Sequence, residues 1–591
     1  MKTKEKIQSK KELYKTLKRI LHSHAPFKRD IGVAASLIFL NKIFFMAIPF
    51  LIGLIVTKLT TDTEISEIVY LISGILVLYL LAIAMDLARF LWEVKYLDMN
   101  VSDHLSSTTN NHLKTLSIGQ HRNKHSLVTI SKVTSGESSM KNFFSSIFYE
   151  VLPIFTGVFI ALTVMTIAYP LAGLFCWFFA ITIIHYAMNA GKKFADPADK
   201  FQSFNKDVVS KSGGELIRNM DSLKIAVEED RYHNIHRSHR KYRYRLFNKI
   251  FTAMGISFSS IQLLSVFGRV SALSVATYMV YNKHYEIGSI AAIIAWSDQS
   301  LGMLYRIGFI FRNLINEWAN IIEYFRIMDT ESDIKKVRNP IEMNTIRGEV
   351  VFDGVFFSYP GSSENSLNGV SFEIKPGEKV GIVGPTGAGK STLLSMLQIA
   401  HLPDIGSVRI DGKDLSNVNQ LEYRSNVGFI EQHPLILSQS IKSNILFGLS
   451  REQRKLITNN DLENVLDRLK LGGLKKRLNT NVGELGVKLS GGQKQRIVIA
   501  RVLLKKPEML IVDEGTSAVD PVTEKIIHDE LDSLSPGSTR IFVAHRISTV
   551  QNADKIIVMN DGIVDAIGTH DDLMESCITY QKLVQNLLFR T

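Results

Sequence analysis

The first half of the chain contains six apolar runs that are each long enough to cross a lipid bilayer. About 20 residues of helix span the hydrocarbon core of a membrane. The runs lie near residues 31–57, 67–92, 143–168, 170–190, 250–281 and 286–314. We therefore predict an α-helical transmembrane domain of six spans over residues 31–330, in which the third and fourth spans form a tight hairpin at Tyr169 and Pro170.

The positive charge of the chain is concentrated beside these runs. The formal net charge is +12; residues 1–30 hold ten Lys/Arg against three Asp/Glu, and residues 191–249 hold fourteen against eight. Basic segments next to membrane helices mark the cytoplasmic side, which favours a membrane over a nucleic-acid partner. We expect residues 1–30 to form an amphipathic segment on the inner face of the bilayer, and the long connections 93–142 and 191–249 to lie in the cytoplasm.

Both long connections have the composition of helices. They contain few Pro and Gly, and their apolar residues recur at helical spacing. The 59 residues of 191–249 can supply two helical arms of about 40 Å each, at 1.5 Å per residue. Such arms would extend the spanning helices well into the cytoplasm.

The composition changes at about residue 347, after a linker that we place at 331–346. Short β-rich runs (EVVFDGVFFSY, EKVGIVG, EMLIVDEG and RIFVAHR) alternate with helical stretches and Gly/Pro turns. This alternation predicts a layered, mostly parallel α/β domain over residues 347–591. The run KIIVMNDGIVDAIG predicts a β-hairpin with Asp561 in its turn.

A phosphate-binding loop follows the strand EKVGIVG. The segment GPTGAGKS fits the pattern G-x4-G-K-[ST] and leads into a helix. Its glycines let backbone N–H groups surround phosphate oxygens, and the helix N-terminus adds its dipole. Lys390 would neutralise phosphates, and the Ser391 hydroxyl would coordinate Mg²⁺. The residues assigned to this loop are Gly384, Pro385, Thr386, Gly387, Ala388, Gly389, Lys390, Ser391 and Thr392.

A pair of carboxylates follows the buried-strand pattern MLIV. In this type of fold an acid at the carboxyl end of a strand lies beside the phosphate loop. Asp513 would hold the Mg²⁺ shell, and Glu514 would orient and deprotonate the attacking water. The alternative is that the two carboxylates only cap the next helix.

A second candidate anion cradle precedes the helix KQRIVIARVLL. It consists of Ser490, Gly491, Gly492 and Gln493, with no lysine and no strand leading in. One nucleotide needs only one phosphate loop, so we expect this cradle to serve the nucleotide of another molecule. A flexible surface turn is the alternative.

In this order, the motifs of residues 347–591 resemble the nucleotide-binding domain of ATP-binding cassette proteins. The resemblance implies an α/β P-loop fold with a helical subdomain, and ATP and Mg²⁺ as cofactors. It also implies four further residues: Tyr359 as a stacking aromatic, Gln432 as a contact for Mg²⁺ and water, Asp520 in a D-loop and His545 as the switch histidine. The sequence departs mildly from the family pattern at His433, Leu485 and Gly515.

Six spans before one cassette resemble the exporter class of this family. Residues 219–224 with Glu228 and Glu229 look like the second coupling region, which in that class docks on the partner's cassette. A weaker likeness, based on residues 112–121 and on Phe311-Arg312, points to the mitochondrial and bacterial sulfur-compound exporters. Val266 and Arg269 differ from that family in the substrate region, so its substrate is not carried over.

Polar groups inside the spans are candidates for a cargo cavity, because they are costly in lipid and tend to mark function. The candidates are Arg269, Asp298, Gln299 and Arg306. For each, a pair between helices or an interfacial position is an equal alternative. Asp86 and Arg89, one helical turn apart, are expected to neutralise each other.

These features predict an ATP-driven exporter in the bacterial inner membrane, with its nucleotide-binding domain in the cytoplasm. It would act as a homodimer, although a heterodimer stays open, and would bind no nucleic acid. The cargo would be an unidentified small molecule or peptide, for example a mature antibacterial peptide or an amphiphile. A lipid flippase, an exporter of sulfur or glutathione compounds and an ATP-gated channel are the alternatives.

Overall fold

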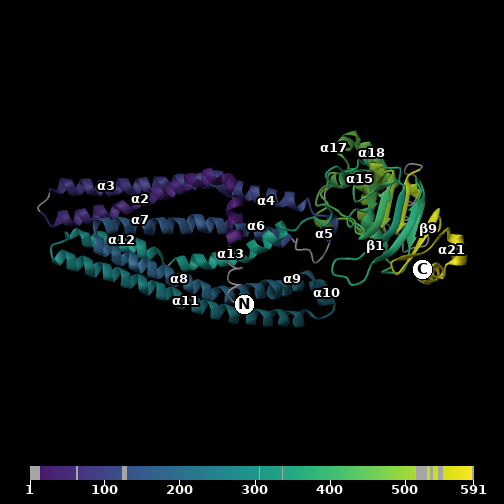
Figure 1. Cartoon of the computed structure of the whole chain (residues 1–591). Helices are drawn as coiled ribbons and strands as arrows, with labels where there is room; N and C mark the ends of the chain where they lie inside the picture. Colours follow the sequence, from purple (N-terminus) through teal and green to yellow (C-terminus); the bar gives the residue numbers. More distant parts are fainter. Residues whose placement is uncertain are drawn as a thin grey trace. The chain divides into compact units, whose positions relative to one another are not determined.

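The chain forms two compact units in the computed structural model (Figure 1). The structure describes residues 14–61, 64–122, 130–304, 306–335, 337–513, 527, 529–532, 537–543 and 550–588. The helical unit comprises Met1–Lys114 and Leu127–Thr330, and the α/β unit comprises Thr115–Ser126 and Glu331–Thr591. A short stretch from the first half of the sequence therefore belongs to the second unit.

The helical unit is built from long helices joined by short turns. The elements up to the first hairpin are η1 (Ala25–Phe27), α2 (Lys28–Leu59), α3 (Ile65–Glu93), η2 (Val94–Asp98), α4 (Met99–Leu113), α6 (Ile130–Ser145), η3 (Ser146–Val151) and α7 (Leu152–Ala168). The rest are α8 (Pro170–Phe204), η4 (Asn205–Ser210), α9 (Lys211–Arg218), α10 (Met220–Ile225), α11 (Glu229–Tyr281), α12 (Gly288–Leu304) and α13 (Ile307–Met328). The tight turn at Tyr169 is present, and the 53 residues of α11 give a rod of about 80 Å.

Five helical stretches are long and apolar enough to cross a membrane among the described residues. They are Ala25–Leu59, Ile65–Leu113, Ser131–Ala168, Pro170–Gly191 and Glu229–Tyr281. The sixth expected span, 286–314, is shared between the 17-residue α12 and the start of α13. Residue 305, directly after α12, lies outside the described residues, so the sixth span stays a prediction.

Close helix packing in this unit depends on small residues and on one buried tryptophan. Gly53 of α2 faces Gly288 of α12 so closely that a Cβ on Gly53 would lie 2.9 Å from the Gly288 carbonyl oxygen. Trp296 is fully buried and donates its Nε1–H to the Met46 carbonyl oxygen at 2.9 Å. Such contacts between small residues let helices approach where a hydrophobic driving force between them is weak.

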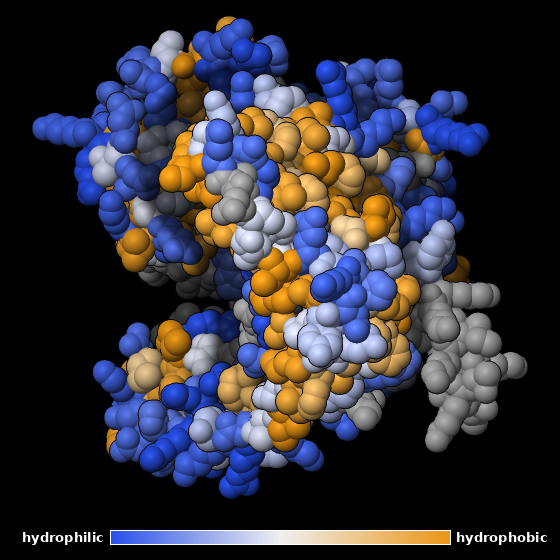
Figure 2. All heavy atoms as spheres, turned by 90° about the vertical axis from the view of Figure 1, so that its left-hand side faces the viewer, coloured by the Kyte–Doolittle hydropathy of each residue, from blue (hydrophilic) through white to orange (hydrophobic). Residues whose placement is uncertain are grey.

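The outer surface of the helical unit is apolar. Figure 2 shows hydrophobic side chains gathered over much of the face turned to the viewer. On α3, large exposed apolar side chains follow one another along the helix; they include Val69, Tyr70, Ile72, Leu76, Leu80, Ile83 and Leu87. An apolar exterior of this extent fits contact with lipid and not with water.

The α/β unit contains two sheets. The larger has the order β10-β9-β3-β8-β7-β6; all neighbours are parallel except β10, which pairs antiparallel with β9 as the predicted hairpin. The smaller sheet, β2-β1-β4-β5, is antiparallel and was not predicted. The strands are β1 (Val350–Phe357), β2 (Leu367–Ile374), β3 (Lys379–Val383), β4 (Ile405–Ile410), β5 (Lys413–Asp414), β6 (Val427–Ile430), β7 (Met509–Asp513), β8 (Thr539–Val543), β9 (Lys555–Asn560) and β10 (Ile563–Gly568).

Helices complete the α/β unit and include a separate helical portion between β6 and β7. They are α5 (Ile118–Arg122), α14 (Lys390–Leu397), α15 (Gln420–Asn426), α16 (Ile441–Ile445), α17 (Arg451–Leu456), α18 (Asn459–Arg468), η5 (Gly472–Arg477), η6 (Glu484–Gly486), α19 (Gly491–Lys505), α21 (His570–Ser576) and α22 (Ile578–Leu588). The predicted fold class, a helical membrane domain with an α/β P-loop domain, is confirmed. The segment 331–346, expected as a linker, places Ile334, Met343 and Ile346 in the core of this unit.

Candidate phosphate-binding site

The carboxyl ends of neighbouring parallel strands bring the predicted site residues to one edge of the larger sheet. β3 ends at Val383 and leads into the phosphate loop, while β7 ends at Asp513 and β6 ends two residues before Gln432. The sheet order places β8 between β3 and β7, with β6 on the far side of β7. Ligands in open α/β sheets bind at this edge, so the topology supports the site expected from the motifs.

The phosphate loop adopts a backbone that requires glycine. Gly389 has φ +96° and caps the N-terminus of α14. A Cβ at Gly389 would lie 2.8 Å from the Ser366 carbonyl oxygen and from Leu367 Cδ2. At Gly384 a Cβ would collide with the Met559 carbonyl oxygen. The loop therefore turns tightly against the sheet, and an open helix N-terminus follows it.

Lys390 lies in the first turn of α14 and folds back over the loop. It is 5 % exposed, and its Nζ donates to the carbonyl oxygens of Gly384 at 2.8 Å and Pro385 at 2.9 Å. Burial lowers the pKa of the Lys390 ammonium, and the charge of Asp513 opposes that change. A buried ammonium held by carbonyl groups at a helix N-terminus suits a phosphate group, which would neutralise it.

Asp513, at the end of β7, lies within electrostatic range of this lysine. Burial raises the pKa of its carboxyl group, the charge of Glu431 raises it further, and Arg122, Lys390 and His433 lower it. A bound cation would favour the ionised form of such a carboxylate. Asp513 therefore fits a magnesium-shell ligand, and Gln432, exposed after β6, lies on the same edge of the sheet.

Arg122 of α5 is a neighbour of this edge that the sequence analysis did not identify. Its guanidinium forms an ion pair with Glu431, the residue before Gln432, and donates to Gln398 Oε1 at 2.5 Å. Gly119 brings the backbone of α5 against the end of the α14 segment, because a Cβ there would lie 2.5 Å from the Ala400 carbonyl oxygen. No local motif marks these contacts, since they join residues nearly 300 positions apart.

Tyr359 lies beside the phosphate loop. It follows β1, and its hydroxyl is 3.3 Å from Thr392 Oγ1. Its ring makes edge contacts with Phe357 and His401, and 38 % of the residue is exposed. A partly exposed ring held in this way beside a phosphate loop can stack on a nucleotide base.

The second cradle is a well-formed helix cap. Ser490 Oγ accepts from the Gln493 N–H at 3.3 Å, and Gln493 Oε1 accepts from the Ser490 N–H at 3.0 Å. This capping box fixes the start of α19, and both Ser490 and Gly491 are exposed. Among the described residues, no hydrogen bond joins this cap to the phosphate loop of the same chain. Glu514, Asp520 and His545 lie outside the described residues.

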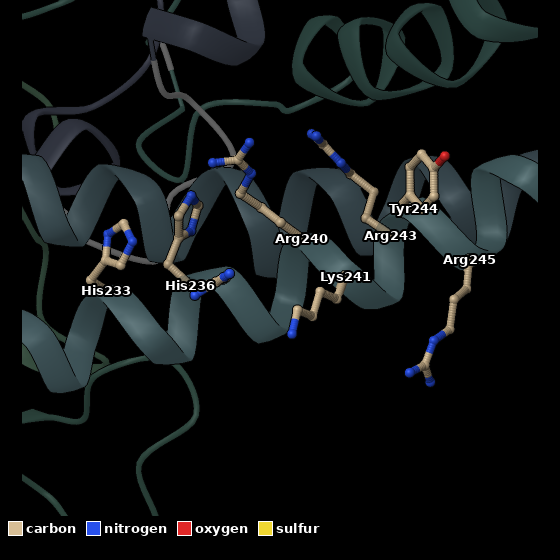
Figure 3. Close-up of a pocket in the computed structure, with 8 residues that line it drawn as sticks. His233, His236, Arg240, Lys241, Arg243, Tyr244 and Arg245 are labelled. Atoms are coloured by element: carbon tan, nitrogen blue, oxygen red, sulfur yellow. The ribbon is translucent and has the colours of Figure 1, made fainter.

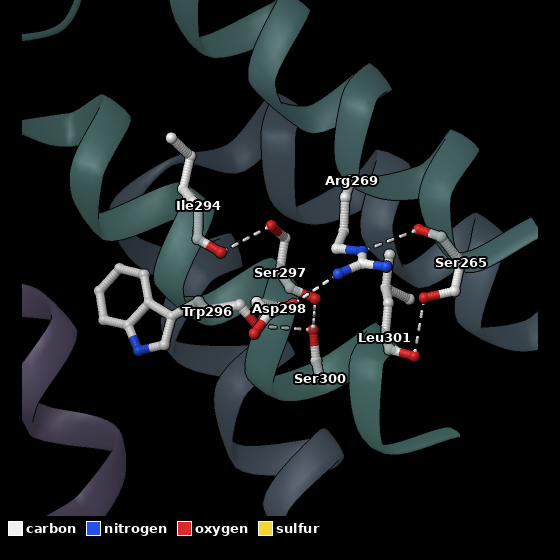
Figure 4. Close-up of polar contacts among 8 residues, drawn as sticks. All are labelled: Ser265, Arg269, Ile294, Trp296, Ser297, Asp298, Ser300 and Leu301. Atoms are coloured by element: carbon white, nitrogen blue, oxygen red, sulfur yellow. Dashed lines mark hydrogen bonds and ion pairs between the residues drawn. The ribbon is translucent and has the colours of Figure 1, made fainter. Parts of the chain in front are cut away.

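The cargo candidates are only partly brought together (Figure 4). Arg269 of α11 and Asp298 of α12 form an ion pair, with 2.5 Å between Nη1 and Oδ1, and Arg269 Nε donates to the Ser265 carbonyl oxygen at 3.4 Å. Gln299 has a buried Oε1 without a hydrogen-bond partner among the described residues. Arg306 is exposed at the start of α13. Arg269 and Asp298 therefore form an ion pair between two helices, which was the alternative to a role in the cargo cavity.

A second charged cluster lies in the helical unit, and its lysine was missed. Asp86 and Arg89 form the expected ion pair at 2.8 Å. Lys42 of α2 lies within electrostatic range of both and of Arg306, and its aliphatic chain passes Gly157 of α7, where an added Cβ would be in ordinary van der Waals contact with Lys42 Cδ at 3.5 Å. The signal was available, because Lys42 is an isolated cation within the first apolar run.

Comparison with known proteins agrees with this geometry. Residues 367–517, which include the phosphate loop and the second cradle, match the family described as ABC transporter. The chain is also 34% identical over 340 residues to a putative multidrug export ATP-binding/permease protein, YgaD, of Bacillus subtilis. Residues 367–517 of the α/β unit therefore form a domain of the ABC transporter type. The chain is an integral membrane protein with an ATP-binding unit.

Two further similarities extend along more of the chain. ATP-binding cassette sub-family B member 6 of Rattus norvegicus is 29% identical over 492 residues, which is 80% of this chain and 56% of that protein. The YgaD match covers 56% of this chain and 57% of YgaD, so the chain spans a little over half the length of these relatives. The solved structure of a bacterial Atm1-family ABC exporter with ATP bound has a TM-score of 0.82 at 23% identity and covers 95% of this chain and 99% of that one. The transporter thus has the same fold as that exporter.

Proposed function

We propose that the chain is one half of a homodimeric exporter that couples ATP hydrolysis to movement of cargo out of the cytoplasm of a bacterial cell. The observation that carries the proposal is the phosphate loop, with Lys390 and Asp513 at one sheet edge, in the same chain as five helices long enough to span a membrane. The multidrug-export name of the YgaD relative and the exporter title of the Atm1-family structure support export over import.

Binding and hydrolysis of ATP would be divided among the following residues. Lys390 and the N-terminus of α14 would hold phosphate oxygens, and Tyr359 would stack on the base. Ser391, Gln432 and Asp513 would hold Mg²⁺, which neutralises phosphate charge during transfer. We assign Glu514 as the general base and His545 as a contact to the terminal phosphate, both by resemblance. Arg122, by pairing with Glu431, would fix the segment that carries Gln432.

A complete site would need two chains. The cap formed by Ser490 and Gln493 serves α19 within its own chain and leaves the exposed N-terminus of that helix available. We propose that it covers the nucleotide held by Lys390 of the partner, with Asp520 at the boundary between the chains. Two nucleotides would then be enclosed between two cassettes.

Cargo would be anionic. Asp298 neutralises Arg269 and Asp86 pairs with Arg89, whereas no described carboxylate forms an ion pair with Lys42 or Arg306. An unpaired cation is costly in lipid, so these two are expected to face water or cargo. A carboxylate-bearing peptide or amphiphile fits such a lining.

An exporter of sulfur or glutathione compounds is a second cargo class. The Atm1-family fold match favours it, and glutathione also bears carboxylates. The two classes are distinguished by measuring which of them, a mature peptide or glutathione disulfide, stimulates ATP hydrolysis by the purified protein. A channel gated by ATP would instead conduct ions down their gradient without turnover of ATP.

The first test is hydrolysis by the purified transporter. Glu514→Gln should keep ATP binding and lower turnover by about a hundredfold, which is the scale of a lost general base. Lys390→Ala should lose binding as well. Near-normal turnover in Glu514→Gln would sink this assignment.

A further inference from the structure

The cytoplasmic half of α11 carries a basic cluster that the export proposal does not use. Between residues 231 and 249 the sequence holds seven Lys/Arg and three His, and no Asp or Glu. Like charges three and four residues apart on one helix destabilise it. A helix with such an arrangement over about five turns would be stabilised by an anionic ligand that neutralises it.

The structure places most of these side chains along one hollow on α11. The hollow, of about 540 Å³, is lined by His233, His236, Arg237, Arg240, Lys241, Arg243, Tyr244 and Arg245. That volume lies within the range of small-molecule sites. In Figure 3, His236, Arg240 and Arg243 project from one side of α11, whereas Lys241 and Arg245 project from the other.

Two of the groups on the first side are held in place by neighbouring elements. Arg243 Nη1 donates to Asn205 Oδ1 at 3.0 Å, and His236 Nδ1 lies 3.0 Å from Ser212 Oγ. Arg240 and Arg243 both act electrostatically on His236. In the described part of the chain, neither arginine forms an ion pair with a carboxylate.

The distance from the bilayer argues against lipid headgroups as the ligand. The predicted fifth span, 250–281, is longer than the about 20 residues that cross the hydrocarbon. Counted back from Tyr281, where α11 ends, about 20 residues place the inner boundary near residue 262. Arg245 is then about 25 Å further along the helix axis at 1.5 Å per residue, or about 24 Å from the boundary at a typical tilt of about 20°. The Debye length at physiological salt is about 8 Å, so membrane charge is screened there.

We propose that the hollow around Arg240, Arg243 and His236 is a binding site for a soluble, multiply charged anion of the oligophosphate type. The guanidinium groups suit bidentate contacts with phosphate oxygens, and Arg237, Lys241 and Arg245 increase the local positive potential. The site lies on the cytoplasmic arm and is separate from both the phosphate loop and the charged clusters of the spans. It does not depend on the identity of the cargo.

The test is calorimetric titration of the full-length protein in phosphatidylcholine nanodiscs with inorganic tripolyphosphate at low salt. All proteins carry Lys390→Ala, which removes phosphate binding at the nucleotide site. We expect saturable binding that Arg240→Gln with Arg243→Gln weakens by about tenfold or more, the scale of lost charge-assisted hydrogen bonds. The control pair, Arg218→Gln with Lys224→Gln, removes the same charge from exposed positions on α9 and α10 and should change the affinity less than about twofold.

Three comparisons complete the test. Unchanged tripolyphosphate binding in the Arg240/Arg243 variant would overturn the proposal, and so would citrate binding more tightly than tripolyphosphate. If phosphatidylglycerol in the nanodisc competes with tripolyphosphate, the ligand is a lipid headgroup and the proposal fails. If the Arg240/Arg243 variant does not fold, Lys241→Gln with Arg245→Gln replaces it. These residues lie on the other side of α11 and contribute to the same positive potential, so tripolyphosphate binding should weaken about threefold or more.

Discussion

Replacement of Gly119 by alanine tests whether α5 is fixed to the α/β unit. The added Cβ would lie 2.5 Å from the Ala400 carbonyl oxygen and 2.5 Å from His401 Cε1. Ala400 is 1 % exposed, so its backbone has little room to move. Overpacking of this kind costs about 1–3 kcal/mol, which is about a fivefold to 150-fold loss in the population of docked α5.

Hydrogen–deuterium exchange of the purified transporter measures this loss directly. Peptides covering residues 115–122 should exchange about fivefold to 150-fold faster in Gly119→Ala, because local opening sets the exchange rate. Arg122 would then lose its contacts with Gln398 and Glu431, so exchange around Gln432 should rise too. Gly473→Ala is the matched control, since nothing lies within 4 Å of a Cβ there. Identical exchange of 115–122 in Gly119→Ala and in the unmodified protein would refute the docking of α5.

Three further predictions concern the nucleotide and cargo sites. Chains with Lys390→Ala and chains with Ser490→Arg should each be inactive alone, but their mixture should regain part of the ATPase rate. In a mixed dimer both substitutions fall in one nucleotide site, and the other site is complete. Full activity of Ser490→Arg homodimers would exclude capping between chains. The pKa of Asp513 is raised in the folded protein, so the ionised carboxylate destabilises the nucleotide-free fold. This destabilisation decreases as the pH falls through the folded-state pKa, because the carboxyl group becomes protonated. Asp513→Asn should therefore raise the melting temperature at pH 7.5, with a smaller gain at pH 5; a lower melting temperature at pH 7.5 would contradict this sign. Lys42→Gln should reduce the stimulation of the ATPase by an anionic peptide more than Arg269→Gln does, because Asp298 already neutralises Arg269. Basal rates should be unchanged in both variants. Equal losses of stimulation would argue against Lys42 as the cavity cation.

Much of the fold followed from the sequence because its signals are local. Long apolar runs predict membrane helices whatever their neighbours are, and the turn at Asp561 specifies its hairpin with few other contacts. The antiparallel sheet of β1, β2, β4 and β5 has no such signal, because its strands are separated by turns and by the phosphate loop.

The residues of the candidate site also differ in whether the local sequence identifies them. Its motif residues, such as Lys390 and Asp513, were identified because each lies within a few positions of a strand end. Arg122 could not be found, because its partner Glu431 is distant in sequence and nothing near either residue marks the pair. The pairing of Arg269 with Asp298 likewise depends on the register of α11 against α12, which composition does not determine.

The central claim is that ATP hydrolysis drives cargo outward, and uptake into inside-out membrane vesicles tests it most directly. Vesicles that contain the transporter should accumulate labelled anionic peptide or glutathione disulfide against its gradient when Mg²⁺ and ATP are added. Vesicles with Glu514→Gln, which retains binding but not turnover, should accumulate almost none. Equal accumulation in both preparations, or equilibration that never exceeds the outside concentration, would contradict ATP-driven export.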